Sequence, residues 1–134
     1  MISNLQMITI YVSDVDRALA FYTSKLGFVK VAEYDDGAGT RLVWVMPEPA
    51  SRDSLATQIA LHAPADRSDP RIGNASGLVF TTRTADEIET TYRELKARDV
   101  PFVMDLVRHG YGEGAGDQEA RFTDPDGNVF ILHT

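Results

Sequence analysis

The fold is set by residues 7–28, MITIYVSDVDRALAFYTSKLGF. In residues 7–12, β-branched side chains occupy alternate positions, and this period of two predicts a strand. Asp14 then offers a side-chain oxygen to the first turn of a helix, whose apolar residues recur at helical spacing over 15–26. Gly27 can adopt the left-handed conformation that ends a helix. The segment therefore predicts a strand, a helix and the start of a second strand.

The same order of elements follows twice along the chain. Alternating apolar patterns predict further strands in the first half at 28–34, 41–46 and 56–62. In the second half they predict strands at 78–80, 102–107, 120–123 and 129–132, with a helix that begins at a capping box of Thr84 and Glu87. We expect one domain over 1–134, made of a first βαβββ module (5–63), a linker (64–76) and a second βαβββ module (77–134).

Composition excludes several classes of protein. The chain has 134 residues, no cysteine and a net charge of −7. Thiolate metal sites and cysteine nucleophiles are therefore excluded, and the acidic balance argues against nucleic-acid binding. The N-terminus lacks a signal-peptide pattern and no apolar run is long enough to span a membrane, so we expect a cytoplasmic protein. The net charge serves either solubility or a cavity that prefers a cationic ligand.

Three motifs, in this order, resemble one known family. They are VSD to FY with LGF (residues 12–28), ELKARDV (94–100) and FTDPDGN (122–128). Together they resemble the vicinal oxygen chelate superfamily of glyoxalases, bleomycin resistance proteins and extradiol dioxygenases. The resemblance implies an α+β fold of two βαβββ modules, each curling a mixed sheet around a cavity. It also makes a homodimer the expected assembly.

The chemistry of this family usually rests on one divalent metal, held by His or Glu side chains from matching strand positions. The resemblance places these positions at Met7, Gln58, Leu78 and Ile131. A thioether, an amide and aliphatic groups are poor ligands for a hard divalent ion. A one-residue shift of register would bring in neighbours such as Ile8 or Val79, and none of these neighbours is His or Glu. We therefore expect no metal and no cofactor.

A displaced metal site is the alternative, and it would have to use the remaining candidate ligands: His62, His109, Glu113 and His133. His62 and His133 lie at predicted strand ends, where imidazoles are commonly solvated. His109 and Glu113 belong to the glycine-rich segment 107–120, which suits either a lid over a pocket or a plain surface loop.

The leading hypothesis is a metal-free protein that binds a small organic molecule, with the antibiotic-sequestering branch of the family as its model. The expected lining comprises Met7, Thr9, Tyr11, Trp44, Gln58, Leu78, Phe80, Tyr111, Arg121 and Ile131. Core packing is the alternative role for the aromatic members, and surface ion pairing is the alternative for Arg121. Two other functions stay open: a lyase, isomerase or dioxygenase with a displaced metal, and a partner domain without a ligand.

Overall fold

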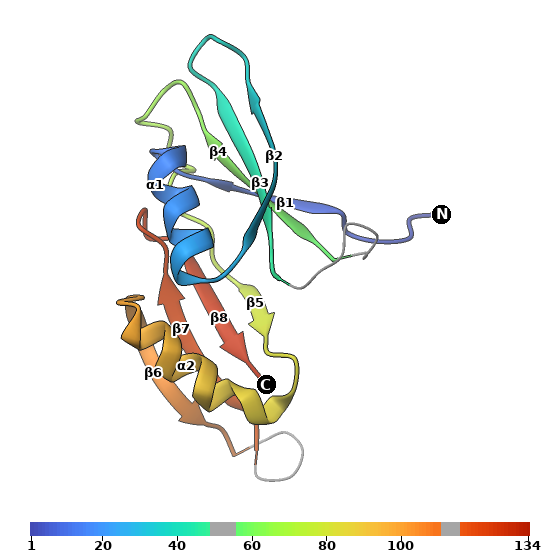
Figure 1. Ribbon diagram of the computed structural model, residues 1–134, viewed down its shortest axis with the longest axis vertical. Helices are drawn as coiled ribbons and strands as arrows, with labels where there is room; N and C mark the ends of the chain where they lie inside the picture. The colour runs from blue at the N-terminus through green and yellow to red at the C-terminus, as the bar shows by residue number, and fades with distance from the viewer. Residues whose placement is uncertain (49–55, 111–115) are drawn as a thin grey trace. The chain divides into compact units, whose positions relative to one another are not determined.

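The computed structural model describes residues 1–48, 56–110 and 116–134 and divides the chain into two compact units. The first unit is Met1–Asn74 and the second is Ala75–Thr134, and each has a four-stranded sheet of its own (Figure 1). The segment expected to be a linker, 64–76, spans this division. That the whole chain acts as a single domain stays a prediction.

The first unit contains one mixed sheet and one helical segment. Its elements are β1 (Met7–Tyr11), α1 (Val15–Ala20), the π-helical turn η1 (Phe21–Lys25), β2 (Val29–Asp35), β3 (Arg41–Met46) and β4 (Gln58–Ala63). The strand order is β1-β4-β3-β2. β1 runs parallel to β4, and the other neighbouring strands are antiparallel.

The second unit repeats this topology. Its elements are β5 (Leu78–Thr81), the 3₁₀ turn η2 (Ala85–Glu87), α2 (Ile88–Ala97), β6 (Phe102–Arg108), β7 (Gln118–Thr123) and β8 (Val129–His133). The strand order is β5-β8-β7-β6, again with a parallel first pair, β5 and β8. The predicted class, two βαβββ modules with mixed sheets, is confirmed. No helix in the described ranges has the length and apolar character needed to cross a membrane.

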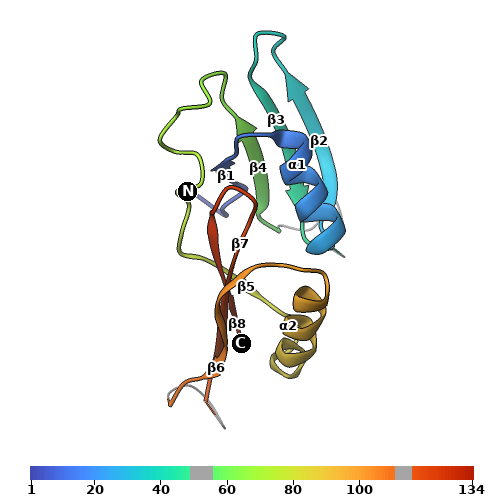
Figure 2. The ribbon, with the colours of Figure 1, turned by 90° about the vertical axis from the view of Figure 1, so that its left-hand side faces the viewer.

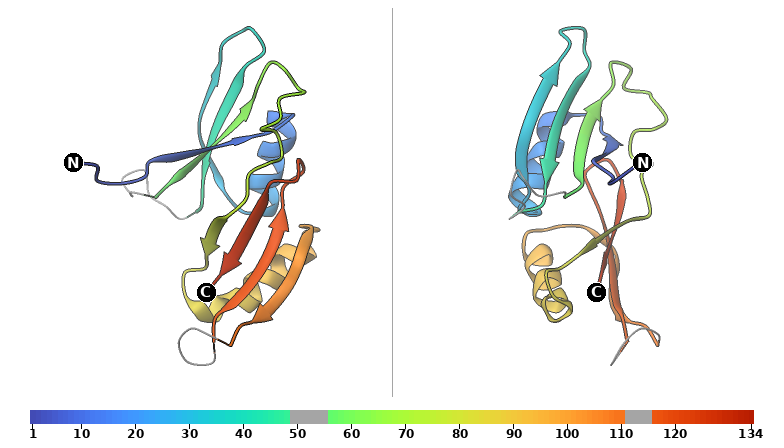
Figure 3. Two further views of the ribbon diagram at one scale, coloured as in Figure 1. Left: turned by 180° about the vertical axis from the view of Figure 1, so that it is seen from behind. Right: turned by 90° about the vertical axis from the view of Figure 1, so that its right-hand side faces the viewer.

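Each sheet has its helix on one side only. Figure 2 shows the second sheet nearly edge-on with α2 on one side of it, and Figure 3 shows strands of each sheet in front of its helix. Because side chains alternate between faces along a strand, one set packs under the helix and the other set lies on what we call the helix-free face. The strand registers fix which residues belong to which set.

In the first unit the helix-covered face forms the core. Ile10 and Leu61 are register partners, as are Val45 and Ile59, and all four are buried where α1 packs against β3 and β4. The helix-free face of the first sheet therefore carries Met7, Thr9, Tyr11, Leu42, Trp44, Gln58, Ala60 and His62.

In the second unit the core is aromatic. The ring of Phe130 lies 5.3 Å from that of Phe80 and 5.5 Å from that of Phe122, and Phe102 lies 5.8 Å from Phe122. The helix-free face of the second sheet carries Val79, Thr81, Glu119, Arg121, Ile131 and His133.

The two helical segments begin differently. Asp14 Oδ1 accepts a hydrogen bond from the Arg17 backbone N–H at 2.9 Å, as the sequence predicts for an N-cap. The predicted capping box of Thr84 and Glu87 is wrong, because the Thr84 side chain makes no capping hydrogen bond. The chain forms a 3₁₀ turn there instead, in which the Glu87 N–H donates to the Thr84 carbonyl at 3.1 Å. The backbone thus satisfies the donor that the hydroxyl would have bonded.

A buried turn closes the second unit. Asn128 is fully buried, and its Nδ2 donates to Asp124 Oδ2 at 2.8 Å. Its Oδ1 accepts from the Ala75 backbone N–H at 2.9 Å, while the Val129 N–H donates to the Ala75 carbonyl at 2.8 Å. In the first unit, the Gly73 N–H donates to the Tyr11 carbonyl at 3.3 Å. Residues on both sides of Asn74 are therefore anchored, each within its own unit.

Helix termination in the first unit gives a stability test. Gly27 has a φ of +75°, and a Cβ built there would meet no atom within 4 Å. Gly27→Ala should therefore lower the free energy of unfolding by about 1–2 kcal/mol through backbone conformation alone. Gly110→Ala is the matched control, because its surroundings are equally open and its φ is not in the left-handed region. Equal urea midpoints for the two variants would contradict this explanation.

Candidate functional site

The first pair of family metal positions lies side by side on the first sheet. Met7 on β1 and Gln58 on β4 are register partners, so their side chains share the helix-free face. On the same face, Trp44 Nε1–H donates a hydrogen bond to Met7 Sδ at 2.8 Å. Trp44 is half-buried and reaches this face because its register partner is Ala60 on β4. The predicted side chains Met7, Trp44 and Gln58 are thus brought together.

These residues do not fit a divalent metal. The Met7 thioether is a soft ligand, and it already accepts the indole N–H of Trp44. Gln58 supplies a neutral amide where a carboxylate would be needed to balance the charge of the ion. No metal-dependent step can therefore be derived from this pair.

In the second pair of family metal positions, the partner of Ile131 is Val79 and not the predicted Leu78. Ile131 on β8 has Val79 as its partner on β5, whereas Leu78 pairs with Phe130. Leu78 and Phe80 consequently face the aromatic core beneath α2, and Val79 shares the helix-free face with Ile131. Val79 is more than half exposed, at 54%. The two positions on this face are therefore aliphatic, and neither can bind a metal.

Tyr11 and His62 form a second cluster on the first sheet. Their rings lie 5.1 Å apart, and the Arg71 guanidinium lies 4.0 Å from the centre of the Tyr11 ring. Arg71 Nη1 also donates to the Tyr11 hydroxyl at 2.8 Å, and Arg71 pairs with Asp69, whose pKa it lowers to about 2. Burial, and then the positive charge of Arg71, lower the pKa of His62, which favours the neutral imidazole.

A buried carboxylate dominates the helix-free face of the second sheet. Glu119 is 6% exposed, and its Oε2 lies 2.7 Å from His109 Nε2. Its Oε1 accepts a hydrogen bond from Arg121 Nε at 2.6 Å. The hydrogen bonds from Arg121 and then His109 lower the pKa of Glu119, so the group is a carboxylate at neutral pH and His109 Nε2 must carry the shared hydrogen.

The sequence predicted Arg121 and His109 as candidates but missed Glu119. The predicted strand began at residue 120, whereas β7 begins at Gln118, so Glu119 and Arg121 stand two residues apart in one strand and share one face. A charged residue on each of two successive positions of one strand face indicates an ion pair on the sheet.

The displaced metal site receives no support from the described residues. His133 Nδ1 lies 2.7 Å from the Thr134 carbonyl, and its Nε2 lies 3.9 Å from Asp117 Oδ2. His62 belongs to the other unit, and Glu113 lies outside the described residues, as does Tyr111. Within the ranges that the structure covers, no group of three or more His, Asp or Glu side chains is arranged to hold a metal ion.

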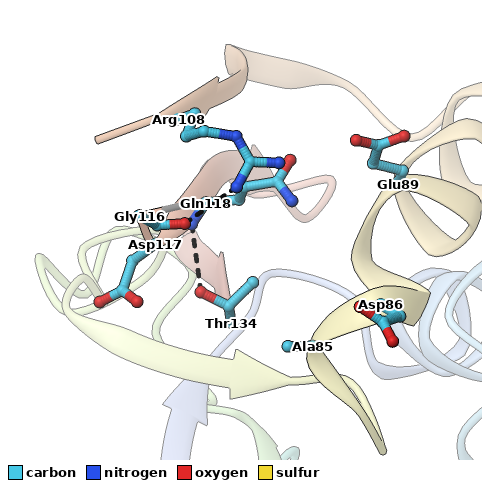
Figure 4. Close-up of a pocket in the computed structure, with 8 residues that line it drawn as sticks. All are labelled: Ala85, Asp86, Glu89, Arg108, Gly116, Asp117, Gln118 and Thr134. Carbon is cyan, nitrogen blue, oxygen red and sulfur yellow. Dashed lines mark hydrogen bonds between the residues drawn. The ribbon is translucent and has the colours of Figure 1, made fainter. Parts of the chain in front are cut away.

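A half-open pocket of about 650 Å³ lies in the second unit, between the start of α2 and the strand ends opposite it (Figure 4). It is lined by Ala85, Asp86, Glu89, Arg108, Gly116, Asp117, Gln118 and Thr134. Arg108 Nη1 donates to the Gly116 carbonyl at 3.0 Å, and the Gln118 N–H donates to Thr134 Oγ1 at 3.1 Å. This lining includes none of the ten predicted ligand-binding residues, so their ligand-binding role stays a prediction.

The pocket contains part of the excess negative charge of the chain. Its charged lining consists of the carboxylates of Asp86, Glu89 and Asp117 with the single arginine Arg108. On the helix-free face of the second sheet, Arg121 presents an exposed positive charge, while its ion-pair partner Glu119 is buried. The net charge of the chain therefore does not describe the charge on this face.

Comparison with known proteins gives one family over nearly the whole chain. The sequence model of the Glyoxalase/Bleomycin resistance protein/Dioxygenase superfamily matches residues 4–132. The Bacillus subtilis protein YurT is 30% identical over 102 residues, which are 76% of this chain and 80% of YurT.

Two solved structures extend the comparison. A superfamily member from Sphaerobacter thermophilus DSM 20745 has 35% identity and a TM-score of 0.77, with 98% of this chain and 97% of that chain covered. TnmS3, an antibiotic binding protein from Streptomyces sp. CB03234, has 29% identity and a TM-score of 0.75, with 98% and 94% covered.

The buried carboxylate gives a test with a defined pH dependence. Glu119→Gln should lower the free energy of unfolding by about 1–3 kcal/mol at pH 7, because hydrogen bonds to a charged group are lost. The lowered pKa means that this stabilisation is complete above the unfolded-state value near 4.5 and is lost as the pH falls through the folded-state pKa. Urea unfolding should therefore show the difference between wild type and variant closing below pH 4.5.

Glu89→Gln is the control for this test. Glu89 is about half exposed and pairs with Arg93 at 3.3 Å on the helix surface, so its removal should change the stability little. A wild-type advantage over Glu119→Gln that persists unchanged at low pH would show that the carboxylate charge is not the cause.

Proposed function

Because the chain belongs to the Glyoxalase/Bleomycin resistance protein/Dioxygenase superfamily, we propose that it binds a small organic molecule without a metal or other cofactor. The observation that carries this proposal is the hydrogen bond from Trp44 to Met7 Sδ beside Gln58. In place of ionic ligands, that face offers an aromatic ring, a thioether and an amide. These groups suit an uncharged or delocalised organic surface better than a cation of high charge density.

The helix-free face of the first sheet supplies the binding groups in this proposal. Thr9 is exposed and pairs with Ala60, which is also the partner of Trp44, so the three residues form one row across the sheet. In the part of the chain that the structure describes, the side-chain amide of Gln58 has no hydrogen-bond partner. It can therefore donate and accept one hydrogen bond each with a ligand.

One solved relative supports a small organic ligand for this chain. TnmS3, which resembles this chain over nearly its full length, is an antibiotic binding protein. Because Trp44 offers an aromatic ring on this face, we propose a ligand with planar aromatic character for this chain, stacked on Trp44 and oriented by Gln58. Stacking on an aromatic side chain tolerates many ring systems and leaves the polar contacts to determine which compound is chosen.

The other hypotheses have fewer structural observations in their support. An enzyme with a displaced metal would draw its ligands from His62, His109, Glu113 or His133, and the described residues contain no group of three or more His, Asp or Glu that could hold a metal ion. The homodimer and the cytoplasmic location stay predictions from the sequence.

Trp44 provides a direct test, because it is the single tryptophan of the chain. Its fluorescence should be quenched saturably by planar aromatic compounds, for which proflavine (a cation) and 2,4-dinitrobenzoate (an anion) serve as probes. The better probe should also raise the free energy of unfolding, by about 2.7 kcal/mol at one hundred times its dissociation constant. Thr9→Glu, in the middle of the proposed face, should weaken the binding of both probes by filling the space above Ala60.

Thr90→Glu is the matched control, since it makes the same substitution at an exposed position of α2 and should leave both affinities unchanged. Quenching that fails to saturate for every aromatic compound tried would contradict the proposal. Stoichiometric nickel, manganese, iron or zinc retained by the purified protein would favour the enzyme instead. Absence of ligand binding together with a co-purified protein would favour the partner domain.

A further inference from the structure

Arg121 occupies the middle of the helix-free face of the second sheet. It lies on β7 with Ile131 as its partner on β8 and Met104 as its partner on β6. Val79 follows next to Ile131 on β5. The Arg121 side chain is 47% exposed, so a cationic group stands among apolar side chains and is open to solvent.

The Arg121 guanidinium is held at its Nε atom by Glu119. Arg121 Nε donates to Glu119 Oε1 at 2.6 Å, and the other oxygen of Glu119 is bonded to His109 at 2.7 Å. The Glu119 side chain is only 8% exposed, so the carboxylate is held at both oxygens and cannot follow a moving arginine outward. Glu119 and His109 therefore act as positioning residues for Arg121.

The Nη end of the guanidinium is the part left for a ligand. Among contacts within the described ranges, Arg121 is bonded through Nε alone. The planar guanidinium carries further N–H donors on Nη1 and Nη2, arranged as a fork that matches the two oxygens of a carboxylate. Because the negative charge of Glu119 is buried behind it, the exposed end of the pair is positive despite the net charge of −7.

We propose that Arg121 binds the carboxylate of an amphipathic small molecule whose apolar part lies over Ile131 and Val79. This goes beyond the proposed function, which uses the first unit, by giving the second unit a group that binds an anion. It also replaces the expectation of a cationic ligand that the overall acidity suggests. Charge-assisted, two-point hydrogen bonds from arginine supply both the attraction and the orientation.

A matched pair of ligands tests this assignment in the intact protein. 2-Naphthoate and 2-naphthamide share the same ring system and differ in the charge of one group. By calorimetry, wild type should bind the naphthoate about tenfold more tightly, which corresponds to about 1.4 kcal/mol. Arg121→Gln should reduce the affinity for naphthoate to that for naphthamide and leave the naphthamide affinity unchanged, while Arg121→Lys should keep part of the preference.

Arg93→Gln is the control for loss of one positive charge, because Arg93 is an exposed arginine on α2, 73% exposed and paired with Glu89. It should leave the preference for naphthoate intact. Equal affinities of wild type for the two compounds would overturn the proposal while leaving the proposed function standing. So would a preference for naphthoate that survives in Arg121→Gln.

A second measurement separates this proposal from failure of the proposed function. If neither naphthalene compound binds, acetate and phosphate are titrated while the Nε–H resonance of Arg121 is followed by NMR. A saturable shift with acetate in wild type would support a carboxylate site even without an aromatic ligand. A shift with phosphate alone would identify a site for inorganic anions and overturn the proposal, as would the absence of any shift.

Discussion

The parallel pairing of the first and last strands in each unit is the constraint on which the rest depends. It puts Met7 opposite Gln58 on one sheet and Val79 opposite Ile131 on the other. Because each sheet is covered by a helix on one side only, this register also decides which side chains are committed to the core. The composition of the helix-free faces, and hence every proposal about ligands, follows from these two pairings.

Charge in this protein has to be considered locally. The chain carries −7 overall, and its acidic groups lie on turns, helices and strands, three of them in the lining of the pocket near the start of α2. An arginine nevertheless lies at the helix-free face of each sheet: Arg71 packs against Tyr11 in the first unit, and Arg121 stands on β7 in the second. The buried carboxylate of Glu119 balances the charge of Arg121, whose side chain stays 47% exposed. Net charge bears on solubility and long-range steering, whereas recognition depends on which end of such a pair meets solvent.

The sequence predicted the order of elements and the placement of Met7, Gln58 and Trp44 well, because alternation and caps are local signals. It placed Leu78 one residue from the position that pairs with Ile131, since the start of β5 was judged from Gly77 alone. That register is decided by hydrogen bonding to β8, far away in the chain. Glu119 escaped notice for a related reason, because its importance comes from His109 and Arg121 closing over it. Side-chain contacts of this kind leave no periodic pattern in the sequence from which they could be predicted.

The anchoring around Asn74 bears on how the chain would tolerate an insertion. Gly73 is hydrogen-bonded to the backbone of β1, and Ala75 is hydrogen-bonded to the buried turn at Asn128, so only Asn74 separates the two anchors. An extra residue placed directly after Asn74 would lengthen the chain between these anchors without removing either of them. Each sheet would then keep its own strand register and the side chains that it presents.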